Sequence, residues 1–347
     1  MKANRNFPIF DLAKALMCLL IAFIHTIPFN VVPLQLKILA PLTRIAVPIF
    51  FMISGYLFFT KIKIKSSHKS KWNYLNKMVL RNLKLYAFWM IILWPITYTY
   101  RKYDQFNQIK GTFNLIWNFL FGSTFIASWY LSALVIGLII VFWLSLHLNS
   151  WQVFLVTLPA YFLCVMTSNY SKLDFMHFFT DSWLRQSSFI WAPYNSFAVA
   201  LVWISISKLF VDYPNFIFLG RSKQRILLIP CIILLYVEQL IIVNLNSYSK
   251  NDCYFSLIPL CCVIFSIILH TSINLKNTKI LRHFSTITYC LHASLNKLIT
   301  SSFNISTTNF GYAFFFLLIT VFFCVVITLA ITKLQNFKYL QWLKYSY

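Results

Sequence analysis

The sequence is short of charge, and this scarcity excludes the soluble protein classes. Only 11% of its 347 residues are charged, whereas 59% are hydrophobic and 19% are aromatic. Two segments, 226–237 and 314–331, contain no charged residue at all. A soluble fold of this length cannot bury so much apolar surface. Because a bilayer core of about 30 Å needs about 20 apolar residues per helix, the composition predicts an all-α polytopic membrane protein.

Glycine, internal repeats and metal-binding cysteine patterns are also scarce or missing. The chain has only 6 glycines and no detectable repeat, which argues against the broken helices and repeated halves of many transporters. Its 8 cysteines form no CxxC or Cys/His spacing, so neither a disulfide nor a metal site is predicted. We expect a single transmembrane domain over 1–347, with no appended soluble domain and no bound cofactor.

Hydropathy divides the chain into about ten candidate transmembrane helices, each ended by a charged or turn-rich segment. The weakest of them is 151–167, which is short. The apolar segment 115–125 is too short to span a bilayer and is expected to be re-entrant or interfacial. The candidates are 8–29, 40–60, 83–101, 126–146, 151–167, 189–211, 226–245, 254–275, 283–303 and 310–332.

The distribution of Lys and Arg over alternate loops predicts the orientation of these helices. If the N-terminus is inside, the inner segments hold twenty of these cations and the outer segments hold seven. Such an excess is typical of cytoplasmic loops, so both termini are predicted to be cytoplasmic (N-in/C-in).

The net charge of +23 does not by itself indicate nucleic-acid binding. Most of the cations lie in inner loops beside helix ends, where topology and anionic lipid explain them. The segment 61–84 is nevertheless unusually rich in cations, and it could also hold a phosphate-rich cytoplasmic ligand.

The first helix has three polar residues on one face. Asp11, Lys14 and His25 are separated by steps of three and eleven residues, which at 100° per residue leave them on one side. Lys14 and His25 are about 16 Å apart along the axis. Because a charge at the bilayer centre costs at least about 2.5 kcal/mol, this face should point into the bundle, with Asp11 able to pair with Lys14. The alternatives are a snorkelling anchor for the pair and an interhelical hydrogen bond for His25.

Five segments of the chain form a recognisable series. The first helix has a cation, ten residues and a histidine, and the second span contains the specific segment 44–57. Three shorter segments follow in order: Arg81-Asn82-Leu83-Lys84, Trp129-Tyr130-Leu131 and Ile287-Thr288-Tyr289-Cys290-Leu291-His292. Together they resemble the acyltransferase-3 family of integral-membrane O-acyltransferases, except that Lys14 stands where the family usually has arginine.

The resemblance implies transfer of an acyl group, usually acetyl, from cytoplasmic acyl-CoA to a hydroxyl of a cell-surface carbohydrate. It also implies a multi-pass protein of the bacterial inner membrane. His25 would then be the general base that takes the proton of the acceptor hydroxyl. The residues that would bind the polyanionic donor are Lys14, Arg81, Lys84 and Arg282.

Other polar residues are further candidates for this site. Glu238, the only glutamate in the chain, could orient His25 or pair with Lys297. His292 is either catalytic or a structural hydrogen-bonding residue. The acceptor is assigned to Trp129, Tyr130 and Arg185, although the two aromatic residues could instead anchor their helix at the membrane interface.

Two other functions are compatible with parts of the sequence. A transporter or flippase for a carbohydrate or lipid-linked intermediate would also need about ten helices and intramembrane charges. A non-catalytic scaffold gives no reason for the charged face of the first helix. The preferred interpretation has the lipid bilayer, acyl-CoA and a carbohydrate acceptor as partners, with no nucleic acid, and leaves the oligomeric state open.

Overall fold

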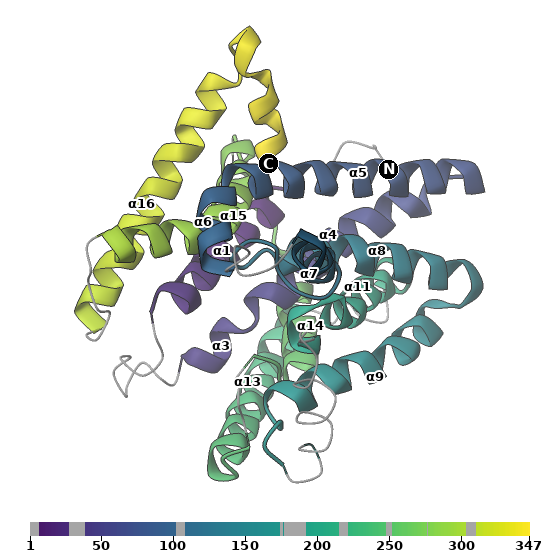
Figure 1. Cartoon of the computed structure of the whole chain (residues 1–347). Coiled ribbons are helices and arrows are strands. Elements are labelled where there is room, and N and C mark those ends of the chain that lie inside the picture. The colour runs from purple at the N-terminus through teal and green to yellow at the C-terminus, as the bar shows by residue number, and fades with distance from the viewer. Residues whose placement is uncertain are drawn as a thin grey trace.

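The computed structural model describes residues 7–27, 39–101, 108–173, 176, 192–214, 221–247, 252–275, 277–302 and 310–347. Every regular element in these ranges is a helix, which confirms the all-α prediction (Figure 1). The elements are α1 (Pro8–Thr26), α3 (Ala40–Thr43), α4 (Ala46–Lys63), α5 (His68–Ile92), α6 (Trp94–Arg101), α7 (Gln108–Phe121), α8 (Trp129–His147), α9 (Ser150–Ser168), η3 (Pro193–Asn195), α11 (Phe197–Asp212), α13 (Arg221–Asn244), α14 (Leu257–His270), α15 (Lys279–Ser302), α16 (Phe310–Leu334) and η4 (Lys338–Ser346).

Six helical segments in the described part of the chain are long and apolar enough to cross a membrane. They coincide with six of the predicted spans: α1, α3 with α4, α8, α9, the apolar part of α13, and α16. α11 and α14 are apolar but only 16 and 14 residues long. α5 and α15 contain more polar side chains. The chain is therefore a multi-pass membrane protein, and the count of about ten spans and the N-in/C-in orientation stay predictions.

Two helix boundaries show what hydropathy does and does not detect. α5 begins at His68, well before the predicted start at 83, because the Ser67 hydroxyl caps it by accepting from the Ser70 backbone N–H. Its basic first half has no apolar run. α9, the weakest predicted span, is a complete helix, and a capping box between Asn149 and Gln152 fixes its start. The apolar segment 115–125 belongs mostly to α7.

α11 forms the centre of the bundle, in contact with α4, α8 and α9. Two glycines allow these helices to approach closely. A Cβ atom added to Gly55 of α4 would lie 3.3 Å from the Cα atom of Ile204, and one added to Gly137 of α8 would lie 3.1 Å from the Cβ atom of Ala200. Small residues at helix contacts are a common packing device in membrane bundles.

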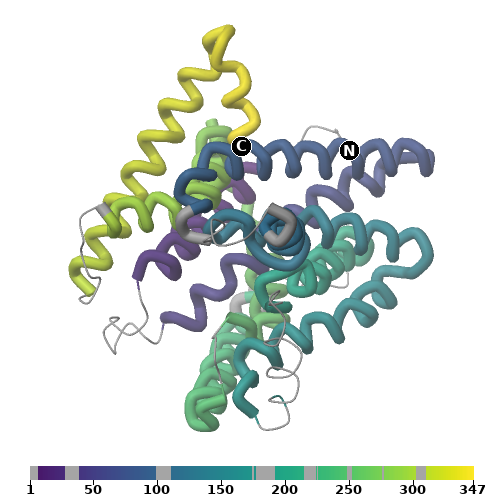
Figure 2. The backbone as a smooth tube through the Cα atoms, viewed as in Figure 1, coloured from purple at the N-terminus to yellow at the C-terminus, as the bar shows by residue number. Residues whose placement is uncertain are grey.

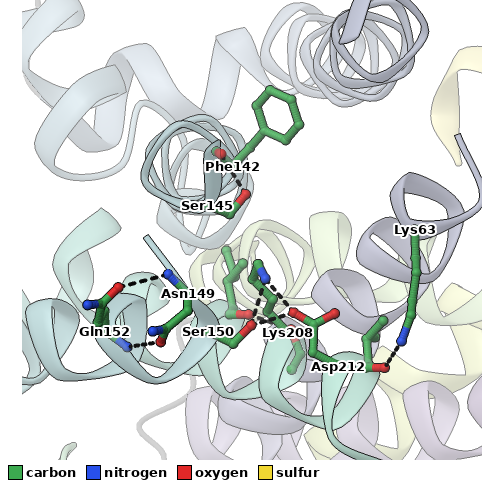
Figure 3. A network of polar contacts seen from close by, with 11 residues as sticks. Lys63, Phe142, Ser145, Asn149, Ser150, Gln152, Lys208 and Asp212 are labelled. Carbon is green, nitrogen blue, oxygen red and sulfur yellow. Dashed lines mark hydrogen bonds and ion pairs between the residues drawn. The ribbon is translucent and has the colours of Figure 1, made fainter. Parts of the chain in front are cut away.

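A polar network joins the ends of three helices around α11 (Figure 3). The Lys208 Nζ atom lies 2.5 Å from the Asp212 carboxylate and donates to the Ser150 hydroxyl at 2.7 Å, and that hydroxyl donates to the same carboxylate. Lys63 donates to the Val211 carbonyl at 2.9 Å. The start of α9 and the end of α4 are thus tied to the end of α11, on the side predicted to be cytoplasmic.

The first and last helices of the chain pack together. α1 contacts α15, α16 and α4, and Figure 2 shows the purple α1 beside the later helices α15 and α16. This packing places the polar face of α1 against α15, as predicted for a face that points into the bundle.

The outer faces of α13 and α16 are apolar and exposed. They display large side chains such as Ile229, Ile233, Leu240, Phe315 and Phe322. Exposed apolar surface of this extent is unsuited to water and suits contact with lipid chains.

Candidate active site

Asp11, near the start of α1, forms an ion pair with α15. The Nε and Nη2 atoms of Arg282 donate to its two carboxylate oxygens, both at 2.9 Å. The sequence allowed a pair between Asp11 and Lys14, but the structure pairs Asp11 with Arg282 instead. A buried carboxylate needs strong donors, and the planar guanidinium fits both oxygens at once.

Arg282 of this pair is one of the four predicted donor-binding cations, and two others, Lys14 and Arg81, lie near it. Lys14 lies within electrostatic range of Arg81, Asp11 and Arg282. The cluster holds three cations and one carboxylate, so it has an unbalanced positive charge. Its cations come from α1, α5 and α15. We call these four residues the cationic cluster.

Lys84, the fourth predicted donor-binding residue, lies one turn further along α5. Its Nζ atom is 5.4 Å from the centre of the Tyr345 ring of η4. Nearby, the Trp89 indole N–H donates to the Ser346 carbonyl at 3.0 Å. The structure therefore places Lys84 against the C-terminal segment, beside the cationic cluster.

His25 lies at the other end of α1, where its exposed side chain lines a cavity of about 580 Å³. The cavity is formed by the end of α1, the α3–α4 junction, the segment that leads into α8, η3, and the starts of α11 and α14, and α9 and α15 each contribute one tyrosine. We call it the His25 cavity. Its lining includes His25, Arg44, Ser123, Trp129, Tyr161, Tyr194, Asn195, Trp203, Asp252 and Tyr289.

One ion pair lies in the wall of the His25 cavity. The Arg44 Nη1 atom is 2.6 Å from Asp252 Oδ1, and each side chain is 26% exposed. The Asp252 backbone N–H donates to Ser168 Oγ and to Asn169 Oδ1, both at 3.1 Å. Both charged groups are thus held in place and balance each other.

Aromatic side chains form much of the remaining wall, and one of them closes a strained turn. The Tyr289 hydroxyl donates to the Ala127 carbonyl at 2.5 Å. Ala127 has φ 62°, a left-handed conformation that costs about 1–3 kcal/mol for a residue other than glycine. Trp129 lies two residues after Ala127 and lines the cavity, and its contact with the acceptor stays a prediction.

His292, on α15, lies behind His25. The ring centroids are 5.2 Å apart, and His292 is fully buried. Its Nδ1 atom lies 2.9 Å from the Thr288 carbonyl oxygen and 2.8 Å from the Tyr289 carbonyl oxygen. The structure therefore brings together two of the three residues predicted to be catalytic.

Glu238, the third predicted catalytic residue, has other partners. Its carboxylate accepts from the backbone N–H groups of Phe255 and Ser256, both at 2.8 Å, and from the Ser256 hydroxyl. These bonds fix the segment that leads into α14. Glu238 is not among the residues that line the His25 cavity.

The other two residues assigned to the acceptor are Tyr130 and Arg185, and Tyr130 does not line the described cavity. Tyr130 is buried behind the wall, with its hydroxyl 3.2 Å from Ser54 Oγ and 3.3 Å from the Phe50 carbonyl oxygen. Arg185 lies outside the described residues.

Sequence reasoning missed the Arg44–Asp252 pair as a site feature. Arg44 opens the most specific of the five recognised segments, so its position there was an available signal. Asp252 lies in no recognised segment and is 208 positions away from Arg44. No local pattern joins two residues at such a separation.

A sequence model of the acyltransferase-3 family, which describes an acyltransferase domain, matches residues 7–329 of the chain. The chain belongs to the acyltransferase-3 family. The match includes α1 to α15 and most of α16, and so includes both the cationic cluster and the His25 cavity.

Curated proteins similar to this chain are named as racemases and not as acyltransferases. A serine/alanine racemase of Enterococcus gallinarum is 28% identical over 155 residues, which is 44% of this chain and 22% of the relative. Two amino-acid racemases of Enterococcus faecalis are 26% and 22% identical over 275 and 279 residues. These alignments cover 75% and 78% of this chain but 36% and 37% of the relatives. The chain thus spans little more than a third of their length, and no solved structure matches it.

Proposed function

We propose that this protein is a membrane O-acyltransferase that moves an acyl group, such as acetyl, from cytoplasmic acyl-CoA to a hydroxyl of a surface or exported carbohydrate. The observation that supports this most directly is the arrangement on α1, with Lys14 in the cationic cluster and His25 in the cavity. The same helix thus presents a site for a polyanion at one end and a base at the other.

The cationic cluster suits the nucleotide end of acyl-CoA. Phosphate groups bind best to paired charged donors, and the guanidinium groups of Arg81 and Arg282 supply planar, permanently charged donors beside Lys14. Asp11 occupies part of the Arg282 fork and leaves Lys14 and Arg81 with no carboxylate partner among the described ion pairs. The donor phosphates would supply the missing negative charge.

The His25 cavity suits a polyhydroxylated acceptor. Its charged side chains, Arg44 and Asp252, neutralise each other, and with Asn195 they offer both hydrogen-bond donors and acceptors. The ring of Trp129 offers an apolar face against which a sugar can pack. Binding pockets commonly combine an apolar wall with a few placed polar groups.

The chemistry needs one base and balances without a further reactant. His25 takes the proton of the acceptor hydroxyl while the hydroxyl oxygen attacks the thioester carbon. A carbon–oxygen bond forms, the carbon–sulfur bond breaks, and the electron pair stays on the sulfur atom. The proton on His25 then neutralises the thiolate, so the products are an ester and free CoA. General-base help of this kind contributes about 10²- to 10⁴-fold to rate.

Acetyl transfer can be tested with the purified protein in lipid nanodiscs. Labelled acetyl-CoA and surface polysaccharide from cells lacking the protein should yield labelled polysaccharide and an equal amount of free thiol. His25→Ala protein serves as the matched control. The alternative of a transporter or flippase predicts uptake of the carbohydrate into proteoliposomes with no thiol release, and that result would replace the proposal.

A further inference from the structure

His292 is placed to act on His25 and not on the substrate. It is fully buried, while His25 lines the cavity. Its ring is 5.2 Å from the His25 ring, centroid to centroid. Any effect of His292 on the transfer reaction would therefore pass through the base.

The contacts of His292 fix its tautomer. Its Nδ1 atom faces two backbone carbonyl oxygens, those of Thr288 and Tyr289. Carbonyl oxygens can only accept hydrogen bonds, so Nδ1 carries the proton and Nε2 has a free electron pair. No described protein group bonds to that buried Nε2 atom. A buried acceptor without a partner costs about 1–3 kcal/mol, so a donor is expected to fill this position.

The His25 ring is the neighbouring group that can supply the donor. The two rings are not hydrogen-bonded as they stand, but their centroids are only 5.2 Å apart. One water can bridge them, or a rotation of the exposed His25 ring can bring one of its nitrogens to the His292 Nε2 atom. Glu238, which could have served, is engaged at α14. Asn296 donates to the His25 backbone carbonyl at 3.5 Å and not to its ring.

We propose that His292 is a positioning residue: its Nε2 atom accepts the ring N–H of His25, directly or through one buried water, and so leaves the other His25 nitrogen unprotonated toward the cavity. This inference rests on the proposed function of His25 as the base. A neutral imidazole has one donor nitrogen and one acceptor nitrogen, so fixing the donor on the buried side provides a free base on the cavity side. In metal sites, residues that orient an imidazole ligand are worth about 10- to 100-fold in affinity or activity, and we expect an effect of the same size here.

Three variants of α15 separate positioning from packing. His292→Leu keeps the volume but removes the acceptor, whereas His292→Gln keeps an amide oxygen that can accept from His25. Ser294→Ala is the matched control, because Ser294 is also buried on α15 with an unpartnered side chain. We expect His292→Leu to lower kcat by about 10- to 100-fold, with the KM values for acetyl-CoA and polysaccharide unchanged. His292→Gln should recover most of kcat, and Ser294→Ala should match the wild type.

A double variant shows whether the effect passes through the base. With His25→Ala already present, adding His292→Leu should not lower the remaining rate further, because residues that act as one unit are not additive. Equal loss in His292→Leu and His292→Gln, or an additive loss in the double variant, would overturn the positioning role. If His25→Ala itself keeps full kcat, the proposed function of His25 fails instead, so the two failures are distinguishable.

Discussion

The two ends of α1 have different electrostatic environments, one with excess positive charge and one with balanced charge. Around Lys14, three cations share one carboxylate, and the positive charge is left unbalanced. Around His25, the only ion pair among the described cavity-lining residues, Arg44 with Asp252, is balanced. A single helix therefore connects a site suited to a polyanion with a site suited to a neutral, hydroxyl-rich molecule. Under the proposed function, the two substrates would enter from different ends and would be distinguished by charge.

The contrast requires the two ends to face opposite sides of the membrane, which reporter fusions can test. Fusions at Ser70 and Leu340 should report the cytoplasm, and a fusion at Phe106 should report the outside, because of the excess of cations in the inner loops. The expected difference is all or none. If Ser70 and Phe106 reported the same side, the map of spans between them would need revision.

The His25 end should be the more sensitive to loss of a single side chain. His25→Ala should lower the transfer rate by at least about 10²-fold, the low end of general-base removal. Insertion into the membrane and binding of acetyl-CoA should stay near wild type, measured by membrane fractionation and by equilibrium binding of labelled acetyl-CoA. Retention of most turnover would remove His25 as the base.

Substitutions in and beside the cationic cluster should instead affect donor affinity. Arg81→Ala should raise the KM for acetyl-CoA by about 10-fold, close to the loss of one charge-assisted hydrogen bond, with little change in kcat. Lys84→Ala should have a smaller effect in the same direction, because Lys84 lies against Tyr345. Steady-state kinetics at saturating polysaccharide measures both. Unchanged donor KM in both variants would contradict the assignment of this end to the donor.

The balanced pair in the cavity should control which acceptors are used. Asp252→Asn and Arg44→Gln should each raise the KM for a neutral polysaccharide by about 5-fold, because each leaves one charge unpaired. The double variant Arg44→Gln/Asp252→Asn should be closer to wild type than the sum of the single effects. A lower KM in Asp252→Asn alone would show that the acceptor is acidic and binds Arg44.

The smallest effect is expected for Lys14→Arg. Both side chains are cationic, and arginine is the residue that the family usually has at this position. The KM for acetyl-CoA should change by less than about 2-fold, because the positive charge that attracts the donor phosphates is retained. A large loss would mean that the amine itself, and not only its charge, is required.

Much of the fold could be predicted because apolar runs and capping residues are local signals. The predicted span 151–167 and the observed α9 differ by one residue at each end. The start of α5 was missed because its basic first half lacks an apolar run. The family and the candidate residues Lys14, Arg81 and His25 followed from the recognised segments. Arg282 lies outside those segments and was a candidate because it is a cation of an inner loop.

Partner choice was harder to predict than residue position. The sequence allowed Asp11 to pair with Lys14 in its own helix, but the Arg282 fork from α15 offers two hydrogen bonds where Lys14 offers a point charge. Glu238 was a candidate either to orient His25 or to pair with Lys297, but backbone N–H groups just before α14 bind its carboxylate. In both cases the observed partner comes from another part of the chain. The spacing of residues within one helix does not reveal such a partner.

Glycine lets neighbouring helix backbones approach closely, so the interface between them is tightly packed. At Gly55 and Gly137, atoms of α11 fill the space that any other side chain would need, so α4, α8 and α11 should move as one rigid block. A carrier that opens each end in turn by rocking would have to divide elsewhere, between this block and the layer of α1, α15 and α16. Movement at such a hinge would separate His25 from Arg44 in every transport cycle. Alternating access would therefore open the same helix interface that the proposed acyl transfer needs closed.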